Sequence, residues 1–143
     1  MNSMFQNFES EIPRGDYKER INLIRSCLIE DGLDGFILPR TDAHQNEFIE
    51  KHDARLEWAT GFTGSAGKCL ILVDFCYVFV DGRYSLQVER EIDPKIFRNL
   101  DSGKVSFYDW LKKNFKGRTI GVDPRLHSAS ELLHAKKICS SKN

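Results

Sequence analysis

The chain has 143 residues, of which 41% are hydrophobic and 29% are charged, and this composition is typical of one folded domain rather than a disordered chain. Its 21 lysines and arginines are balanced by 21 aspartates and glutamates, so the formal net charge is zero. Because nucleic acids and anionic membrane surfaces attract proteins with a clustered basic excess, this balance argues against both as main partners.

The amino-terminal sequence has no apolar stretch behind a basic start, and the longest apolar run, residues 70–80, is interrupted by Asp74. We therefore predict neither a signal peptide nor a membrane span, and we expect the protein in the cytoplasm. The four cysteines show no CxxC pattern and lie mostly at apolar positions, which favours reduced, buried thiols. We expect residues 1–14 to form a flexible arm ahead of a domain over residues 15–143.

In the first part of this domain, apolar residues recur every three or four positions after Asp16, which predicts a helix with Asp16 as N-cap and Gly32 as its stop. The apolar run 35–38, closed by Pro39, predicts a buried strand. The polar segment 40–52 follows at the end of this strand, where binding groups gather in α/β proteins. Residues 53–60 predict a short helix, and residues 61–67 predict a glycine-rich turn.

Residues 68–73 and 76–80, separated by Asp74 and Phe75, predict an antiparallel hairpin. Alternation gives each strand two apolar faces, so we expect both strands to lie at the centre of the sheet with helices on both sides. One face holds Cys69, Ile71, Val73, Cys76, Val78 and Val80, and the other holds Leu70, Leu72, Tyr77 and Phe79.

After the hairpin, we predict a helix over residues 81–91 with Leu86 and Val88 inside, a strand over 95–100, a helix over 105–115 and a strand over 119–122. A last helix capped by Ser128 would leave His127 and His134 facing solvent. This order predicts an α/β domain with a mixed sheet of about five strands, a central antiparallel hairpin and helices on both faces.

Common catalytic motifs do not fit the sequence. The glycine-rich turn is followed by a strand rather than a helix, and its spacing matches neither a P-loop nor a dinucleotide-binding fingerprint. No histidine or carboxylate cluster has the spacing of a metal site. Ser65 lacks the GxSxG frame of a nucleophile elbow.

A set of polar residues at two strand ends remains as the candidate site. It can be interpreted as loop charges that pair with one another, or as a recognition surface for a polar ligand or another domain. Within it, an aspartate and an arginine two residues apart would suit a buried ion pair that pins the hairpin to the following helix. The set is Asp42, His44, Glu47, Arg55, Asp81 and Arg83, and the pair is Asp81 and Arg83.

Three motifs in this region resemble a known family. Residues 40–48 (RTDAHQNEF), 55–67 (RLEWATGFTGSAG) and 81–84 (DGRY), with residues 121–124 (GVDP) later in the chain, are similar to the amino-terminal domain of Xaa-Pro aminopeptidases. The match is to the long, cytosolic, three-domain form of aminopeptidase P, in the creatinase/prolidase superfamily (peptidase family M24). The resemblance implies a ribonuclease-H-like α/β fold and a parent enzyme that removes an N-terminal residue preceding proline.

The resemblance also implies where catalysis takes place. In this family two divalent metals, commonly manganese, are held by a separate C-terminal domain, and none of its ligands has a matching position in this chain. We therefore expect this chain alone to hold no cofactor and to be inactive. Its expected partner is that catalytic domain, and the resemblance leaves open whether the protein also forms a homo-oligomer. The domain would help to wall the substrate cleft and shape subunit or domain contacts.

For individual residues, the resemblance suggests two groups. The first would face substrate, and the second would maintain the fold. An alternative function is a free-standing peptide- or protein-binding module that has lost the catalytic domain. The substrate-facing candidates are Asp42, His44, Glu47 and Arg55, and the fold-maintaining residues are Gly61, Gly64, Gly67, Asp81 and Arg83.

Overall fold

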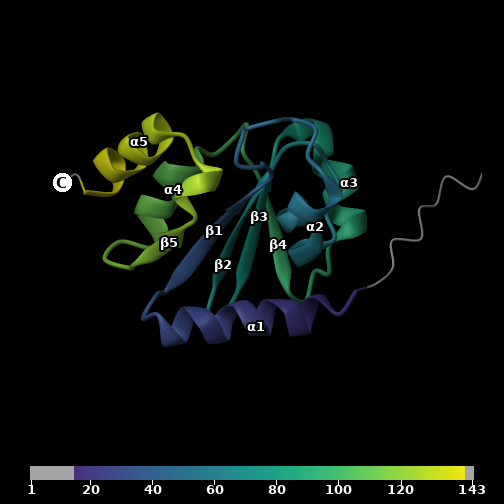
Figure 1. The fold of residues 1–143 in the computed structure, drawn as a ribbon, viewed down its shortest axis with the longest axis horizontal. Helices are drawn as coiled ribbons and strands as arrows, with labels where there is room; N and C mark the ends of the chain where they lie inside the picture. The colour runs from purple at the N-terminus through teal and green to yellow at the C-terminus, as the bar shows by residue number, and fades with distance from the viewer. Residues whose placement is uncertain (1–14, 141–143) are drawn as a thin grey trace, which may run out of the picture.

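A five-stranded mixed sheet forms the middle layer of the structure, a computed structural model that describes residues 15–140 (Figure 1). Residues 1–14, predicted as an arm, lie outside the described residues. The strands are β1 (Gly35–Pro39), β2 (Lys68–Leu72), β3 (Cys76–Val80), β4 (Phe97–Asp101) and β5 (Ile120–Val122). The helices are α1 (Tyr17–Glu30), α2 (Arg55–Thr60), α3 (Ser85–Glu91), α4 (Phe107–Asn114) and α5 (Ala129–Ser140).

The strand order is β4-β3-β2-β1-β5, and β2 is antiparallel to both of its neighbours. The outer strands are parallel to the strands beside them, β5 to β1 and β4 to β3. Four strands therefore run in one direction, and their carboxyl ends meet at one edge of the sheet. The predicted mixed sheet with its inner antiparallel hairpin is confirmed.

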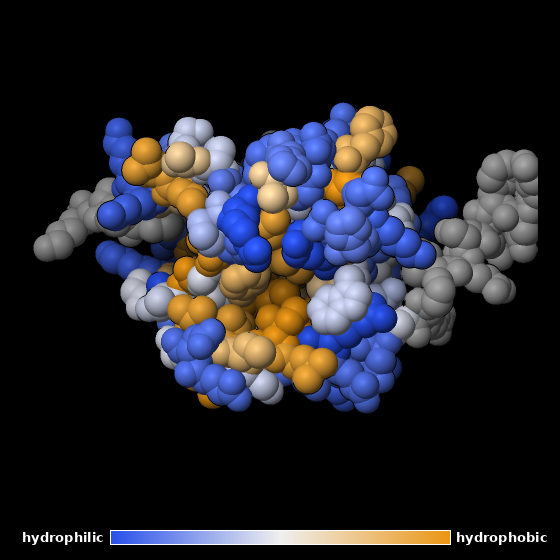
Figure 2. All heavy atoms as spheres, in the orientation of Figure 1, coloured by the Kyte–Doolittle hydropathy of each residue, from blue (hydrophilic) through white to orange (hydrophobic). Residues whose placement is uncertain are grey.

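Two apolar cores lie on the two faces of this sheet. Helices α1, α2 and α3 pack against one face, and α4 and α5 pack against the other (Figure 1). The predicted alternation of the hairpin is confirmed for both faces, because Cys69, Ile71 and Val78 join the first core while Leu70 and Phe79 join the second. Figure 2 shows hydrophobic side chains gathered near the middle of one face of the molecule, with hydrophilic side chains around them.

Two details of the predicted core are wrong. Val73 is 39% exposed because β2 ends one residue earlier, where the N–H of Leu72 donates to the carbonyl of Phe75 at 2.9 Å and closes the turn. Leu86 is 71% exposed although Val88 is fully buried. Residues two apart on a helix point to nearly opposite sides, so the short α3 can bury only one of them.

The predicted helix boundaries are set by their capping residues. The carboxylate of Asp16 accepts a hydrogen bond from the N–H of Glu19 at 3.1 Å, and the hydroxyl of Ser128 accepts one from the N–H of Glu131 at 3.1 Å. Gly32 follows α1 with a φ of 66°, the left-handed conformation that glycine adopts most readily. Within residues 15–140, no helix combines the length and the apolar character needed to cross a bilayer.

Candidate functional site

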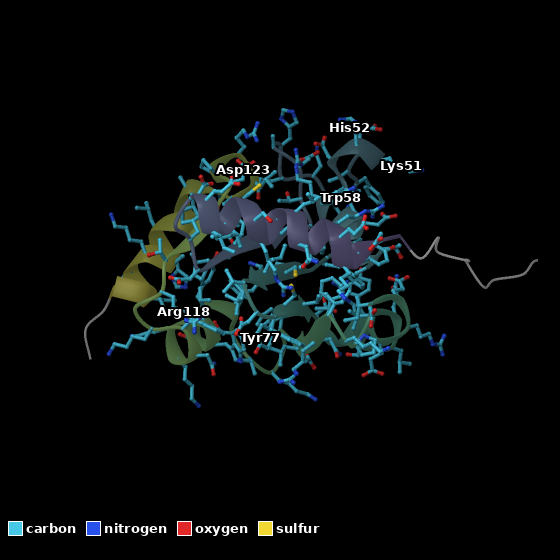
Figure 3. The ribbon with its side chains drawn as sticks, turned by 90° about the horizontal axis from the view of Figure 1, so that it is seen from below. Lys51, His52, Trp58, Tyr77, Arg118 and Asp123 are labelled. Carbon is cyan, nitrogen blue, oxygen red and sulfur yellow. The ribbon has the colours of Figure 1, made fainter. Side chains whose placement is uncertain are left out.

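The carboxyl ends of β1, β3 and β5 open into loops that carry the polar candidates. Charges from different segments reach one another there. The pKa of Arg83 is raised mainly by its hydrogen bonds to Asp81 and to a lesser extent by Glu47, and the pKa of Asp123 is lowered mainly by its hydrogen bond from Arg125 and to a lesser extent by Arg55. In Figure 3, Lys51 and His52 of the first loop lie on the same side of the molecule as Asp123. The structure therefore brings candidates from separate segments to one edge of the sheet.

Asp42 organises the loop that follows β1. Its side chain is nearly buried, and its Oδ1 accepts hydrogen bonds from the N–H groups of His44 (2.9 Å) and Asn46 (3.0 Å). The side-chain amide of Asn46 donates to Oδ2 at 3.0 Å. The bond from the backbone of Asn46 is the main cause that holds the pKa of Asp42 below its ordinary value, against the opposing effect of burial. Asp42 thus acts by positioning its neighbours.

Those neighbours face solvent. His44 and Glu47 are exposed, and Phe48, which the sequence interpretation did not select, is 88% exposed. Arg55 is half-buried at the start of α2, and its Nη1 lies 3.1 Å from a carboxylate oxygen of Asp53. An aromatic ring, a carboxylate and an imidazole are therefore presented together on a loop whose backbone is fixed from within.

We predict that Asp42→Ala loosens this loop. Three hydrogen bonds to one carboxylate are lost, so we expect the free energy of unfolding to fall by about 1–2 kcal/mol. Hydrogen exchange at the amides of His44 and Asn46 should become faster. The exposed Asp74, replaced in the same way, is the matched control and should leave both measurements unchanged. Unchanged exchange at both amides of the Asp42 variant would contradict the positioning role.

Asp81 and Arg83 form a local ion pair at the end of β3. Nε of Arg83 lies 3.0 Å from Oδ1 of Asp81, and Nη2 lies 2.8 Å from Oδ2. This hydrogen-bonded pairing lowers the pKa of Asp81 and raises that of Arg83. The prediction of a buried pair is wrong, because the side chain of Arg83 is 74% exposed and both residues belong to the same turn. The carboxylate also accepts from the N–H of Arg83 at 3.0 Å, so the pair shapes that turn.

The glycine-rich turn packs around one aromatic ring. Phe62 is fully buried, and a Cβ added to Gly64 would lie only 2.2 Å from Cζ of this ring. Nε of Arg40 donates a hydrogen bond to the carbonyl of Gly64 at 2.8 Å, and the backbone N–H of Arg40 donates one to the carbonyl of Gly67 at 2.9 Å. Gly61 ends α2 with a φ of 82°. The turn therefore connects α2, β1 and β2 through close backbone contacts that side chains would block.

A second polar cluster, centred on Glu131 of α5, was not predicted. Its Oε1 accepts from the hydroxyl of Tyr108 at 2.8 Å and from Nζ of Lys68 at 3.1 Å, and its Oε2 lies 3.3 Å from Nδ1 of His127. Burial alone would raise the pKa of Glu131, but the bond from Tyr108 and the charge of Lys68 outweigh it, so the pKa is lowered. The four residues come from β2, α4 and α5 and its preceding turn.

The prediction that His127 faces solvent is wrong. Its side chain is fully buried, because it precedes α5 in an extended conformation rather than lying on the exposed face of that helix. The spacing of four residues between His127 and Glu131 was the one available sequence signal for this contact. Among the residues that the structure describes, no group of three or more histidine, cysteine, aspartate or glutamate side chains is arranged to hold a metal ion. These residues therefore do not fit a dinuclear metal centre.

With this geometry in place, comparison with known proteins assigns the chain to a family. Residues 20–143 match the Creatinase/Prolidase N-terminal domain. The chain belongs to this family of amino-terminal domains.

Xaa-Pro aminopeptidases are among the curated proteins that are similar to the chain. The chain is 37% identical over 113 residues to Xaa-Pro aminopeptidase 1 of Dictyostelium discoideum, a match that covers 77% of this chain and 18% of that protein. It is 37% identical over 109 residues to human Xaa-Pro aminopeptidase 2, covering 76% and 16% respectively. The chain thus spans less than a fifth of the length of these relatives.

Solved structures confirm the fold. X-prolyl aminopeptidase of Caenorhabditis elegans, a cytosolic enzyme with a di-nuclear active site, superposes with a TM-score of 0.78 at 25% identity, over 85% of this chain and 22% of that one. The N-terminal domain of the cytoplasmic peptidase PepQ from Mycobacterium tuberculosis superposes with a TM-score of 0.65 at 19% identity. The match covers 87% of this chain and 88% of that domain. The second match is to an isolated domain of similar size, and it shows the fold alone.

Proposed function

We propose that the chain serves as the non-catalytic amino-terminal domain of a metal-dependent Xaa-Pro aminopeptidase. The observation that carries this proposal is the combination of the family match with a preorganised polar loop at the carboxyl edge of the sheet. In α/β domains this edge is where ligand-contacting loops gather. The parent enzyme would remove an N-terminal residue that precedes proline.

Within that enzyme, the loop over residues 40–55 would form part of the wall of the substrate cleft. His44 and Glu47 are exposed on it, Asp42 holds its backbone, and Arg55 is anchored by Asp53. A peptide substrate carries an ammonium group, amide dipoles and side chains, and an exposed carboxylate, imidazole and aromatic ring offer partners for each. The surrounding charged turns would face a catalytic domain of the same enzyme.

The catalytic metals, which we propose to be two divalent ions such as manganese, would be held by that other domain. Paired metals activate water and polarise a carbonyl, and the described residues of this chain supply no ligand set for them. The present residues would bind and orient the peptide. The cytosolic C. elegans enzyme supports a cytoplasmic location for the parent protein.

The test of the non-catalytic role uses the purified chain. Incubated with Mn²⁺ and a peptide that has proline at its second position, the chain alone should release no N-terminal residue above the rate of a heat-denatured sample. Xaa-Pro aminopeptidase 1 of D. discoideum under the same conditions is the positive control. Turnover that stays with the chain through successive columns, and that Asp42→Ala or Glu47→Ala reduces, would overturn the proposal.

A further inference from the structure

One residue of the 40–55 loop has a backbone conformation that its residue type does not favour. Gln45 has a φ of 60°, and within residues 15–140 it is the only residue other than glycine with a positive φ. Residues with a Cβ adopt this left-handed conformation rarely, and glutamine adopts it less readily than asparagine or aspartate. Glycine at this position would therefore fold at a lower conformational cost.

Asp42 imposes this conformation on Gln45 from both sides. The N–H groups of its two neighbours, His44 and Asn46, donate to Oδ1 of the aspartate at 2.9 Å and 3.0 Å. The N–H of Gln45 itself donates to the carbonyl of Asp42 at 3.2 Å. Unfavourable backbone conformations persist only where such contacts impose them, and they occur most often at sites that bind a ligand. The loop thus holds a glutamine where glycine would be more stable.

The side chain of Gln45 has no contact inside the domain that would offset this cost. It is exposed, and within the described part of the chain its carboxamide makes no hydrogen bond. A carboxamide has N–H donors and a carbonyl acceptor but no charge. It therefore matches both polar groups of a peptide unit, which offers one carbonyl and one N–H, better than it matches an ammonium or a carboxylate.

We propose that Gln45 contacts the substrate and hydrogen-bonds to the peptide unit that follows the proline. This inference rests on the proposed function, in which the 40–55 loop forms part of the wall of the substrate cleft. The bond that is cleaved ends at the proline nitrogen, which carries no hydrogen. In a peptide such as Ala-Pro-Ala-Ala, the first unit with both a carbonyl and an N–H is therefore the one after the proline. One carboxamide can donate to that carbonyl and accept from that N–H.

The test compares two substrates of a chimera in which this chain replaces the matching segment of Xaa-Pro aminopeptidase 1 of D. discoideum. One is Ala-Pro-Ala-Ala, and the other has an E-alkene in place of the peptide unit after the proline. The alkene keeps the shape of that unit but has no donor or acceptor. Because two neutral hydrogen bonds are lost, Gln45→Ala should lower kcat/KM for the tetrapeptide about tenfold. For the alkene substrate the same variant should lower it by less than about twofold.

Gln45→Gly separates the effect of the side chain from that of the backbone. It should lower kcat/KM for the tetrapeptide as much as Gln45→Ala does, because both variants lack the carboxamide. The purified chain with Gln45→Gly should nevertheless unfold at a higher urea concentration than the chain with Gln45→Ala. Glu89→Ala, at an exposed position of α3, is the control and should retain the kcat/KM of the chimera for both substrates.

A binding measurement on the purified chain does not depend on the activity of the chimera. When Ala-Pro-Ala-Ala is added at millimolar concentration, the NMR signals of the carboxamide N–H groups of Gln45 should shift. The alkene analogue should shift them less, because it offers this group no partner. Equal shifts with the two peptides, or no shift with either, would overturn the inference.

Three kinetic results would also overturn it. They are full kcat/KM of a folded Gln45→Ala chimera, activity that Gln45→Gly restores, and equal losses for the two substrates, which would indicate a contact with the catalytic domain instead. A His44→Ala/Glu47→Ala chimera distinguishes this failure from failure of the proposed function. If that chimera loses activity while the Gln45 variants do not, only the role of Gln45 is wrong, and if all of them keep full activity, the loop does not form part of the cleft.

Discussion

Replacing Gly64 by alanine should lower the free energy of unfolding by about 3 kcal/mol, the largest effect we expect from adding a single methyl group. The new Cβ would lie 2.2 Å from Cζ of Phe62 and 2.9 Å from its Cε1 and Cε2. Phe62 is fully buried and packs edge-on against Tyr84, with ring centroids 5.8 Å apart, so its ring cannot turn aside cheaply. Inserting a group into a filled core forces such shifts at a cost of about 1–3 kcal/mol or more.

Chemical denaturation measures this effect, with Gly82→Ala as the matched control. Gly82 has no neighbouring atom within 4 Å of an added Cβ, so its replacement should change the free energy of unfolding by less than about 0.5 kcal/mol. Equal stability of the two variants would show that the turn around Phe62 relaxes freely. It would then have no special need for glycine at position 64.

Glu131→Gln should lower the free energy of unfolding by about 1.5 kcal/mol at pH 7. The substitution keeps the shape of the side chain but removes the charge that Lys68 faces and weakens the acceptor of the Tyr108 hydroxyl. Bonds to charged groups contribute about 1.5–3 kcal/mol, and the carboxylate is 27% exposed, which places the effect at the lower end of that range. Urea denaturation of both proteins measures the difference.

The loss should depend on pH in a defined direction. The pKa of Glu131 is lowered in the folded state, so its ionised form contributes stability above the unfolded pKa near 4.5. That contribution disappears as the pH falls through the lowered folded value. The wild type and the Gln variant should therefore converge in stability at acid pH. Glu89→Gln, at an exposed position of α3, is the control, and a difference that stays constant from pH 7 to acid would contradict the charge-based account.

The parts of the fold that sequence predicts are those that depend on local periodicity. The two faces of the hairpin follow from the alternation of residues 68–80, and the start of α1 follows from one aspartate three residues before a glutamate. Both signals act within a few positions of the chain. These predictions therefore do not depend on contacts between distant segments of the chain.

Contacts between distant segments were not predictable in this way. Lys68 and Glu131 are 63 positions apart, and nothing in the sequence near either residue indicates that they meet. His127 is buried because the extended backbone before α5 places its side chain beside Glu131, which is a tertiary effect. The candidate site has the same limit. The residue types at strand ends placed Asp42 and Glu47 in one group of substrate-facing candidates and did not distinguish their orientations. Only the conformation of the loop shows that Asp42 points inward while Glu47 faces solvent.

The measurement that tests the central claim most directly is the kcat/KM of a chimera. In it, this chain replaces the matching segment of Xaa-Pro aminopeptidase 1 of D. discoideum, to which it is 37% identical. If the 40–55 loop forms part of the substrate cleft, the chimera should cleave Xaa-Pro peptides, and His44→Ala/Glu47→Ala should lower kcat/KM at least about tenfold. The control, Glu89→Ala/Lys104→Ala, should retain the activity of the chimera. Full activity of a folded His44→Ala/Glu47→Ala chimera would contradict the proposed role of this loop.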